Sequence, residues 1–494
     1  MKIVVVGGGT AGWLAALMIS KKFKYQHTVE VIESTKIGII GAGEGSTGKL
    51  TEIIQGTNFD YGCNQQDFAK NCDVTTKLGI NFVGWRDDPT YNYIAPIDGT
   101  ATATQHVDSA FVYALSSLGE KRHIATELGY RIETNKTDLH INNGNLAYHF
   151  DAHKVGQYFK KVCGPAVKHI DAEVQEVKLN ENGFIASLSL SNGNEVRGDF
   201  FIDATGFNRK LVSALNANNW ISYKENLPVN SAMPFIVRYK DDEIISPVTT
   251  ARAQANGWMW DIPTLQRRGC GYVFCDDFVT ADQAHAELEQ NLGFKVDPIR
   301  VIKFDTGRLQ NLWVKNCLAI GLSAAFAEPL EATSIHTTIV QLQNFIEELG
   351  FNLNDTCTTK KITHYNTENG RMYDLLKDFL VMHYQGGRKD SEFWKYISSG
   401  ATQTQFVKDI IAVAKYRVPN AGLFFNTEGS AGWTLWSYIM AGTGTLTEET
   451  AKKELEYQGI EADAIDAYKN AMNNFINAGN TLIDNTTLVR KMAL

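Results

Sequence analysis

The stretch KIVVVGGGTAGWLAALMISKKF, residues 2–23, decides the fold of the first part of this 494-residue chain. It runs from an apolar pentapeptide typical of a buried parallel strand, through a glycine-rich turn, into an apolar helix. TVEVIES (28–34) returns as a second strand. The three segments together predict a right-handed β-α-β unit.

The glycines of the turn have the spacing of a dinucleotide-binding loop, Gly7-x-Gly9-x-x-Gly12. This spacing permits a tight turn and lets a pyrophosphate approach the N-terminus of the helix. Glu33 ends the second strand, where a carboxylate can accept hydrogen bonds from a ribose. Because both NAD and FAD are bound by this pattern, the loop predicts a dinucleotide site and leaves the cofactor open.

Composition and charge exclude several other classes of protein. Hydrophobic residues make up 44% and charged residues 21% of the chain, which is typical of a globular protein with a large core. The net charge is −8 and no basic patch is visible, so we expect no nucleic-acid partner. The seven cysteines are scattered without a CxxC pair, which predicts neither disulfides nor a metal site. With no apolar run long enough to span a membrane and no signal-like N-terminus, we expect a cytoplasmic protein without membrane association.

The pattern of elements predicts an α/β fold with two parts. Short strands separated by Asn-Gly turns between about 173 and 206 predict a β-meander, and a second β-rich block covers about 229–276. Helical periodicity dominates the rest of the chain from about residue 346. We therefore predict a Rossmann-like module over 1–345, with a β-sheet inserted at about 225–300, and a mostly helical region over 346–494.

Two later segments favour FAD as the cofactor. FFIDATGF (200–207) and NCLAIGLSAAF (316–326) resemble the second and third motifs of FAD-dependent hydroxylases, and they follow the glycine loop in the same order. The resemblance assigns Asp203, Gly321 and Leu322 to the cofactor site. The alternative for residues 200–207 is a buried strand that ends in a turn.

The segment GWMWDIP (257–263) places Trp258 and Trp260 two residues apart in an expected strand, so that both rings face the same side. It forms an expected hairpin with GYVFC (271–275). Lys77, in TTKLGINFVGW (75–85), has apolar neighbours that predict partial burial, and burial lowers the pKa of an amine. On base rates alone, a lysine here is more often a surface residue that enters a strand.

Together with GAGEGS (41–46), AYHFDAHKVGQYF (147–159) and AEPLEATSI (327–335), these segments resemble flavin-dependent halogenases of the tryptophan halogenase family. The resemblance spans most of the chain. It implies that reduced FAD (FADH2), oxygen and a halide (chloride, bromide or iodide) give hypohalous acid, which passes along a tunnel to Lys77. The resemblance also implies that the tryptophans separate the flavin from the aromatic substrate and that Glu331 takes up the ring proton. The implied site comprises catalytic Lys77 and Glu331; cofactor-binding Gly7, Gly9, Thr10, Ala11, Gly12, Glu33, Gly41, Ala42, Glu44, Asp203, Gly321 and Leu322; halide-binding Thr333 and Ser334; and Trp258, Trp260, Ile262 and Pro263 along the tunnel.

Two departures from the family pattern concern the halide and the substrate. After Glu331, the usual Ser-Thr-Gly is replaced by Ala332-Thr333-Ser334, so halide preference cannot be carried over. Where tryptophan-specific members carry His-Pro-Phe, this chain has Ala95-Pro96-Ile97. We therefore expect a small electron-rich aromatic substrate rather than tryptophan alone.

Two other functions remain open at this point. An FAD-dependent aromatic monooxygenase shares the flavin motifs, and a non-catalytic protein could use the fold only to bind a partner. The chain has no second nucleotide fingerprint for NAD(P)H, so we expect a separate flavin reductase to supply FADH2. The sequence leaves the oligomeric state open, a homo-oligomer included.

Overall fold

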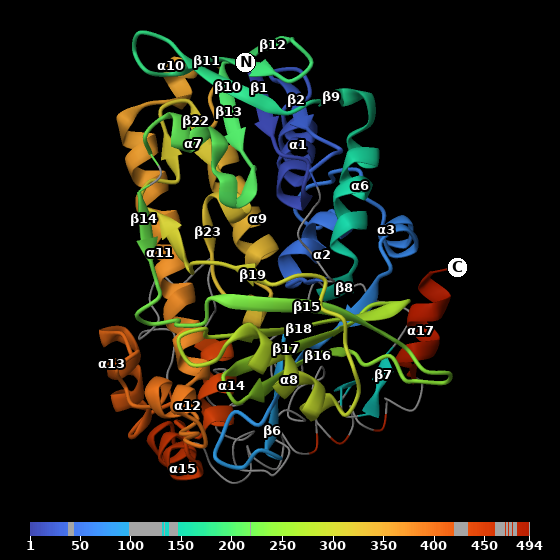
Figure 1. Cartoon of the computed structure of the whole chain (residues 1–494), viewed down its shortest axis with the longest axis vertical. Coiled ribbons are helices and arrows are strands. Elements are labelled where there is room, and N and C mark those ends of the chain that lie inside the picture. The colour runs from blue at the N-terminus through green and yellow to red at the C-terminus, as the bar shows by residue number, and fades with distance from the viewer. Residues whose placement is uncertain are drawn as a thin grey trace. The chain divides into compact units, whose positions relative to one another are not determined.

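The computed structural model describes residues 1–37, 44–97, 131–132, 134–137, 147–217, 219–418, 433–459 and 482–493, and single positions at 470, 473 and 477. The chain divides into two compact units, and each unit is assembled from three separate stretches. The first unit comprises 1–73, 150–223 and 305–374. The second unit comprises 74–149, 224–304 and 375–494. Figure 1 labels the helices and strands of both units.

The first unit is built on a six-stranded sheet with the order β21-β22-β13-β1-β2-β9. Its pairings are parallel except at the β21 edge. The apolar run in the central strand β1 is buried because neighbours cover it on both sides, as parallel sheets require. The predicted β-α-β unit and the α/β class are therefore confirmed. The strands are β1 (Lys2–Val6), β2 (Thr28–Glu33), β9 (Val167–Asp171), β13 (Phe200–Asp203), β21 (Trp313–Val314) and β22 (Cys317–Ala319).

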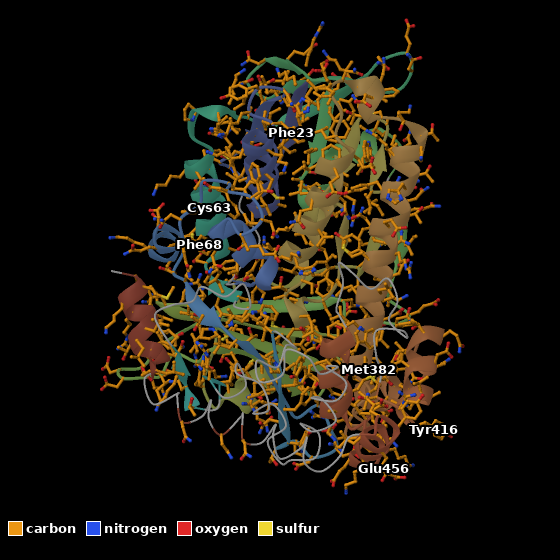
Figure 2. The ribbon with its side chains drawn as sticks, turned by 180° about the vertical axis from the view of Figure 1, so that it is seen from behind. Phe23, Cys63, Phe68, Met382, Tyr416 and Glu456 are labelled. Atoms are coloured by element: carbon orange, nitrogen blue, oxygen red, sulfur yellow. The ribbon has the colours of Figure 1, made fainter. Side chains whose placement is uncertain are left out.

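Helix α1 (Thr10–Lys22) lies beside α6 (Ala152–Cys163) in the first unit (Figure 1). Phe68, labelled in Figure 2, is fully buried and meets the ring of Tyr158 edge-on, with 5.2 Å between the centroids. The predicted meander is present as an antiparallel sheet between β9 and β13. Its strands are β10 (Val174–Leu179), β11 (Ile185–Leu190) and β12 (Glu195–Arg197).

The remaining elements of the first unit include a small sheet, β14-β20-β23, and several helices. The strands are β3 (Glu44–Gly45), β14 (Trp220–Ser222), β20 (Gly307–Leu309) and β23 (Ala325–Phe326). The helices are α2 (Gly48–Gln55), α3 (Gln65–Asn71), α7 (Lys210–Ala214), α9 (Ser334–Glu348) and α10 (Leu353–Thr356), with α11 (Thr359–His383) continuing into the second unit.

The second unit is built on a seven-stranded sheet with the order β19-β15-β18-β17-β16-β5-β6. The hairpin predicted around GWMWDIP is confirmed, because β17 pairs antiparallel with β18. All other pairings are antiparallel as well, except for the parallel pair of β16 with β5. The strands are β5 (Gly79–Val83), β6 (Asn92–Pro96), β15 (Ser231–Arg238), β16 (Val248–Gln254), β17 (Gly257–Pro263), β18 (Arg267–Phe274) and β19 (Ile302–Lys303).

The two faces of this sheet carry different side chains. Met259 belongs to an apolar cluster that also contains residues of α8 (Ala281–Leu292), so α8 covers its face. Trp258 and Trp260 face the opposite side, as the period of two in a strand requires. The C-terminal region is helical, as predicted. Its described elements are α12 (Glu392–Ile397), α13 (Gln405–Ala414), α14 (Trp433–Thr443), α15 (Glu448–Tyr457) and α17 (Asn485–Met492).

Two short strand pairs complete the second unit. One joins β4 (Thr75–Lys77) to β8 (Ala147–Phe150), and the other joins β7 (Lys136–Thr137) to β24 (Ile483–Asp484). No described helix is both long and apolar enough to cross a lipid bilayer. Over the described residues, no group of three or more His, Cys, Asp or Glu side chains is arranged to hold a metal ion. All seven cysteines are free thiols.

Candidate functional site

The glycine turn of the first unit forms a cradle at the N-terminus of α1. A Cβ placed on Gly12 would lie 1.9 Å from the carbonyl oxygen of Gly7, so only glycine fits there. No atom lies within 4 Å of a Cβ placed on Gly9, which leaves its backbone open to a ligand. No side chain caps the first turn of α1. Its backbone N–H groups and the positive end of the helix dipole suit a pyrophosphate.

Glu33 is held at the end of β2 by a cluster of donors. Its carboxylate accepts a hydrogen bond from Trp13 Nε1 at 3.1 Å, and it pairs with Lys160 Nζ at 2.7 Å. His169 Nε2 lies 2.8 Å from the same carboxylate. A Cβ on Gly8 would collide with this group, so the carboxylate lies directly against the glycine turn. Sequence reasoning missed these partners, because Lys160 and His169 are far from Glu33 along the chain.

Asp203 is fully buried, and both of its carboxylate oxygens are committed to the protein. Oδ1 accepts hydrogen bonds from the Thr205 backbone and hydroxyl and from Ser323 Oγ at 3.1 Å. Oδ2 accepts the backbone N–H groups of Leu211 and Val212. Asp203 therefore joins the second motif to the third, since Ser323 belongs to NCLAIGLSAAF.

The third motif, NCLAIGLSAAF, also contacts the glycine turn of the first motif. Gly321 has a φ of +56°, and a Cβ placed on it would lie 2.9 Å from the Cβ of Ala11. Leu322 follows in a short turn and is partly buried. Thr10 uses its hydroxyl to bond the Ala152 carbonyl at 3.3 Å. The three motifs thus converge at the carboxyl ends of the parallel strands. Gly41 and Ala42, which were also predicted for the cofactor site, lie outside the described residues.

Glu44 is half-buried and lies close to Asp151. Burial, followed by the negative charge of Asp151, raises the pKa of Glu44 to about 7. Thr47, in the same loop, begins α2 and its Oγ1 lies 2.9 Å from Nδ1 of His336 in α9. The loop that carries Glu44 is therefore tied to the helix that follows AEPLEATSI.

The segment around Glu331 makes a sharp turn into α9. Ala332 adopts the left-handed conformation, with a φ of +52°. For a residue with a side chain, this conformation costs roughly 1 kcal/mol. Thr333 is the N-cap of α9 and its side chain makes no capping hydrogen bond, so the first backbone N–H groups remain available to an anion. Glu331 and Thr333 are half-buried and Ser334 is exposed, whereas Glu328 is buried.

Lys77 lies in the second unit, at the end of β4, and only 1% of its surface is exposed. The sequence predicted partial burial, and the structure buries this residue almost completely. His149 of β8 is also fully buried. Burial and the charge of Lys77 hold the pKa of His149 well below its ordinary value. Hydrogen bonds join His149 to Thr75 and Thr249, and Thr75 Oγ1 in turn donates to the Pro263 carbonyl at 2.5 Å.

The two tryptophans of β17 are buried with their ring centroids 6.3 Å apart. Trp258 also lies 6.3 Å from Trp85, whose Nε1 donates to the Ala251 carbonyl at 2.8 Å. Trp85, Trp258 and Trp260 thus form a continuous row of buried rings, called the aromatic wall below. Ile262 and Pro263 are buried on the same strand. The signal for Trp85 was present in TTKLGINFVGW, but its place beside Trp258 depends on the pairing of β5 with β16.

The residues that stand in place of the family's His-Pro-Phe, 95–97, lie at the end of β6 and directly after it. Ile94 and Ile97 pack against a cluster that includes Leu78 and Leu488. Tyr93 instead stacks on Phe82, with 4.8 Å between centroids. In the C-terminal region, the rings of Trp436 and Tyr438 are buried.

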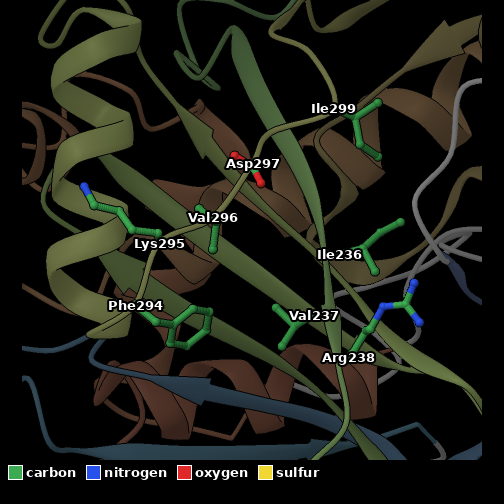
Figure 3. Close-up of a pocket in the computed structure, with 8 residues that line it drawn as sticks. All are labelled: Ile236, Val237, Arg238, Phe294, Lys295, Val296, Asp297 and Ile299. Carbon is green, nitrogen blue, oxygen red and sulfur yellow. The ribbon is translucent and has the colours of Figure 1, made fainter.

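A surface hollow of about 290 Å³ in the second unit is separate from these residues (Figure 3). It lies between β15 and the segment after α8. Three of its apolar side chains, Ile236, Phe294 and Ile299, are exposed. None of the residues predicted for the site lines it. The full lining is Ile236, Val237, Arg238, Phe294, Lys295, Val296, Asp297 and Ile299.

The chain is similar to known proteins in both sequence and structure. A family model described as Tryptophan halogenase matches residues 2–456. The 7-chloro-L-tryptophan 6-halogenase KtzR of Kutzneria sp. is 31% identical over 427 residues, covering 80% of this chain and 81% of that protein. The tryptophan 6-halogenase ThaL of Streptomyces albogriseolus is 29% identical over 483 residues, covering 90% of this chain and 89% of that protein.

The fold is also shared with solved structures. Tar14, a tryptophan C-6 flavin-dependent halogenase from taromycin biosynthesis, superposes with a TM-score of 0.89 at 26% identity, and the match covers 100% of both chains. The tryptophan halogenase from Shewanella frigidimarina superposes with a TM-score of 0.91 at 23% identity, covering 100% of this chain and 97% of that chain. The likeness therefore extends over both units.

Proposed function

The chain belongs to the tryptophan halogenase family and is a flavin-dependent halogenase, and from this premise we propose that it attaches a halogen to a small, electron-rich aromatic ring. The reaction uses reduced FAD, oxygen and a halide ion. A hypohalous acid is the halogen source, and Lys77 receives the electrophilic halogen beside the substrate. The observation that carries this proposal is the burial of Lys77 close to β17, the strand of Trp258 and Trp260 (the tryptophan strand). Thr75, two residues before Lys77, donates a hydrogen bond to the carbonyl of Pro263 at the end of that strand.

The residues of the first unit fit FAD. The backbone at Gly9 is open, the first turn of α1 has no side-chain cap, and Glu33 is fixed against the glycine turn. We propose that the α1 N–H groups hold the pyrophosphate and that Glu33 accepts the ribose hydroxyls. Asp203 supports the cofactor site indirectly, because its carboxylate oxygens hold the second and third motifs in place. Bound FAD, once reduced, supplies the electrons that convert oxygen and halide into the halogenating agent.

Lys77 and Glu331 have different tasks in this proposal. A buried amine can hydrogen-bond or covalently hold an electrophilic halogen. When the ring attacks the halogen of a hypohalous acid that is hydrogen-bonded to the Lys77 ammonium, a carbon–halogen bond forms and the halogen–oxygen bond breaks. The ammonium gives the oxygen a proton, so that it leaves as water. The ring proton then passes to the Glu331 carboxylate, which also stabilises the cationic ring before the proton leaves.

The aromatic wall explains why halogenation would prevail over hydroxylation. Trp258 and Trp260 are buried on one face of β17 and are supported by Trp85. Rigid rings of this size would separate the organic substrate from the flavin while a small hypohalous acid passes. Thr333 and Ser334, at the uncapped N-terminus of α9, are proposed to hold the halide.

The decisive experiment supplies the purified enzyme with FAD, NADH, a separate flavin reductase, oxygen and a panel of aromatic compounds, with and without bromide or chloride. We expect a halogenated product that appears only with the halide, detected by its isotope pattern in mass spectrometry. A hydroxylated product formed without halide would instead identify an aromatic monooxygenase. FAD binding without any product from the panel would favour a non-catalytic protein.

A further inference from the structure

His149 shares a strand face with Lys77. In the antiparallel pair of β4 and β8, Thr75 lies opposite His149 and Lys77 lies opposite Ala147. Directly opposed residues point to the same side of a sheet, and so do residues two apart in one strand. Thr75, Lys77 and His149 therefore project from one face, with His149 diagonal to the lysine.

The hydrogen bonds around His149 fix its tautomer. Thr75 Oγ1 donates its only hydrogen to the Pro263 carbonyl, which has no hydrogen to give. The 3.2 Å contact between Thr75 Oγ1 and His149 Nδ1 must therefore be donated by Nδ1–H. Nε2 is then the acceptor, and Thr249 Oγ1 donates to it at 2.9 Å. A continuous chain of hydrogen bonds thus runs from β16 through His149 and Thr75 to the end of the tryptophan strand.

This arrangement requires a neutral imidazole. Burial, followed by the charge of Lys77, holds the pKa of His149 well below its ordinary value, while a hydrogen bond with the Thr76 backbone acts in the opposite sense. A protonated ring would carry a hydrogen on Nε2 and could no longer accept from Thr249. It would also place a second positive charge beside the lysine.

We propose that His149 is a positioning residue for Lys77. Its Nδ1–H bond to Thr75, together with the Thr75 bond to Pro263, fixes the lysine strand β4 to the end of β17. This inference rests on the halogenase function proposed above. Lys77 is two residues from Thr75 on a three-residue strand, so a shift at Thr75 moves the lysine amine. Displacements of about 1 Å can cost on the order of a hundredfold in rate when geometry limits the reaction.

Two pairs of variants test the roles of the two ring nitrogens, Nδ1 and Nε2, separately. His149→Asn keeps a donor near the Nδ1 position, whereas His149→Gln keeps an acceptor near the Nε2 position. Thr75→Val removes the link to Pro263, whereas its matched control Thr249→Val removes only the bond to Nε2. We expect His149→Gln and Thr75→Val to lower the halogenated product per flavin oxidised by about tenfold or more, and His149→Asn and Thr249→Val to lower it by about twofold at most.

The readouts are product per flavin oxidised, FAD affinity, the melting temperature, and the NMR signal of the Lys77 Cε carbon in protein labelled with ¹³C-lysine. That signal is assigned by its loss in Lys77→Met. We expect it to move in His149→Gln and Thr75→Val while FAD affinity stays unchanged. If wild-type enzyme halogenates nothing, the proposed function fails, and the NMR shifts alone still decide the positioning role. Equal losses in both members of each pair, in proportion to a lower melting temperature, would overturn the inference and leave His149 as a packing residue.

Discussion

The indole ring of Trp260 lies directly over the backbone of Gly271, its partner across the β17–β18 hairpin. A Cβ placed on Gly271 would lie 2.1 Å from the ring, much closer than van der Waals contact. The glycine therefore leaves the space that the second ring of the wall occupies. A side chain at position 271 would displace the ring of Trp260.

Gly271→Ala should consequently reduce halogenated product per flavin oxidised. FAD affinity should change little, because the residues proposed to bind FAD belong to the other unit. Overpacking of this kind typically costs about 1–3 kcal/mol of stability. The measurement is product yield alongside a thermal melt. Trp260→Phe in the Gly271→Ala background should recover the melting temperature, since the smaller ring needs less room. No recovery would mean that strain elsewhere in the hairpin causes the effect.

Replacing Trp258 and Trp260 with alanine should uncouple flavin oxidation from halogenation. Both rings are buried, so each truncation is also expected to cost about 3–5 kcal/mol of folding free energy. Stopped-flow oxidation of reduced flavin and product yield should be measured on protein shown to be folded. If each lost fraction of activity equals the fraction of unfolded protein, the rings serve only for packing.

Lys77→Ala should abolish halogenation while leaving FAD binding intact. Loss of an essential group in a concerted site costs roughly 4–6 kcal/mol in the barrier, or several powers of ten in rate. Lys77→Met is the better-folded control, because it fills the buried volume without an ammonium group. Combining Lys77→Met with Glu331→Gln should cost little more than the worse single change, since both groups serve one step. Near-wild-type turnover of either lysine variant would end this assignment.

Glu44 should make folding stability depend on pH. Its pKa rises from 4.5 to about 7 in the folded protein, so the folded state binds a proton more tightly than the unfolded chain does. The stability from this proton is fully present below pH 4.5 and is lost as the pH rises through about 7. A shift of this size corresponds to at most roughly 3 kcal/mol.

Glu44→Gln removes the titrating group and should flatten the fall of the melting temperature between pH 4.5 and pH 7. Glu52→Gln, in the neighbouring helix α2, is the matched control. Asp151→Asn should lower the pKa of Glu44, because it removes the second cause of the shift. An unchanged pH profile in Glu44→Gln would assign the slope to another group.

The substrate range should extend beyond tryptophan. Ile94 and Ile97 are packed into an apolar cluster. Residues 94–97 contain no aromatic side chain, whereas tryptophan-specific members carry His-Pro-Phe in this segment. An offset aromatic stack contributes about 0.5–1.5 kcal/mol, so its loss weakens the preference for indole. A competition panel of neutral phenols, anilines and indoles against tryptophan measures this preference. The highest specificity constant for tryptophan, with a single regioisomer, would contradict the prediction.

Local patterns determined much of this protein. The run KIVVVGGGTAGW specifies a strand, a turn and a helix from neighbouring residues alone, and the structure contains all three. The spacing of Trp258 and Trp260 specifies a shared face, because side-chain direction in a strand depends only on residue parity. The fold class and the hairpin of β17 with β18 were predictable for the same reason.

Tertiary structure decided what distant segments do to one another. Each unit gathers three separate stretches, and no local pattern predicts that 75–77, 147–149 and 257–263 belong to the same unit. The same holds for Lys160 on Glu33, Ser323 on Asp203, and His149 beside Lys77. Hydrogen bonds and burial depend on which surfaces meet, and that is set by packing across more than a hundred residues of chain. The sequence therefore specified the residue types and local directions, and the packed fold gave each group its partners and its protonation.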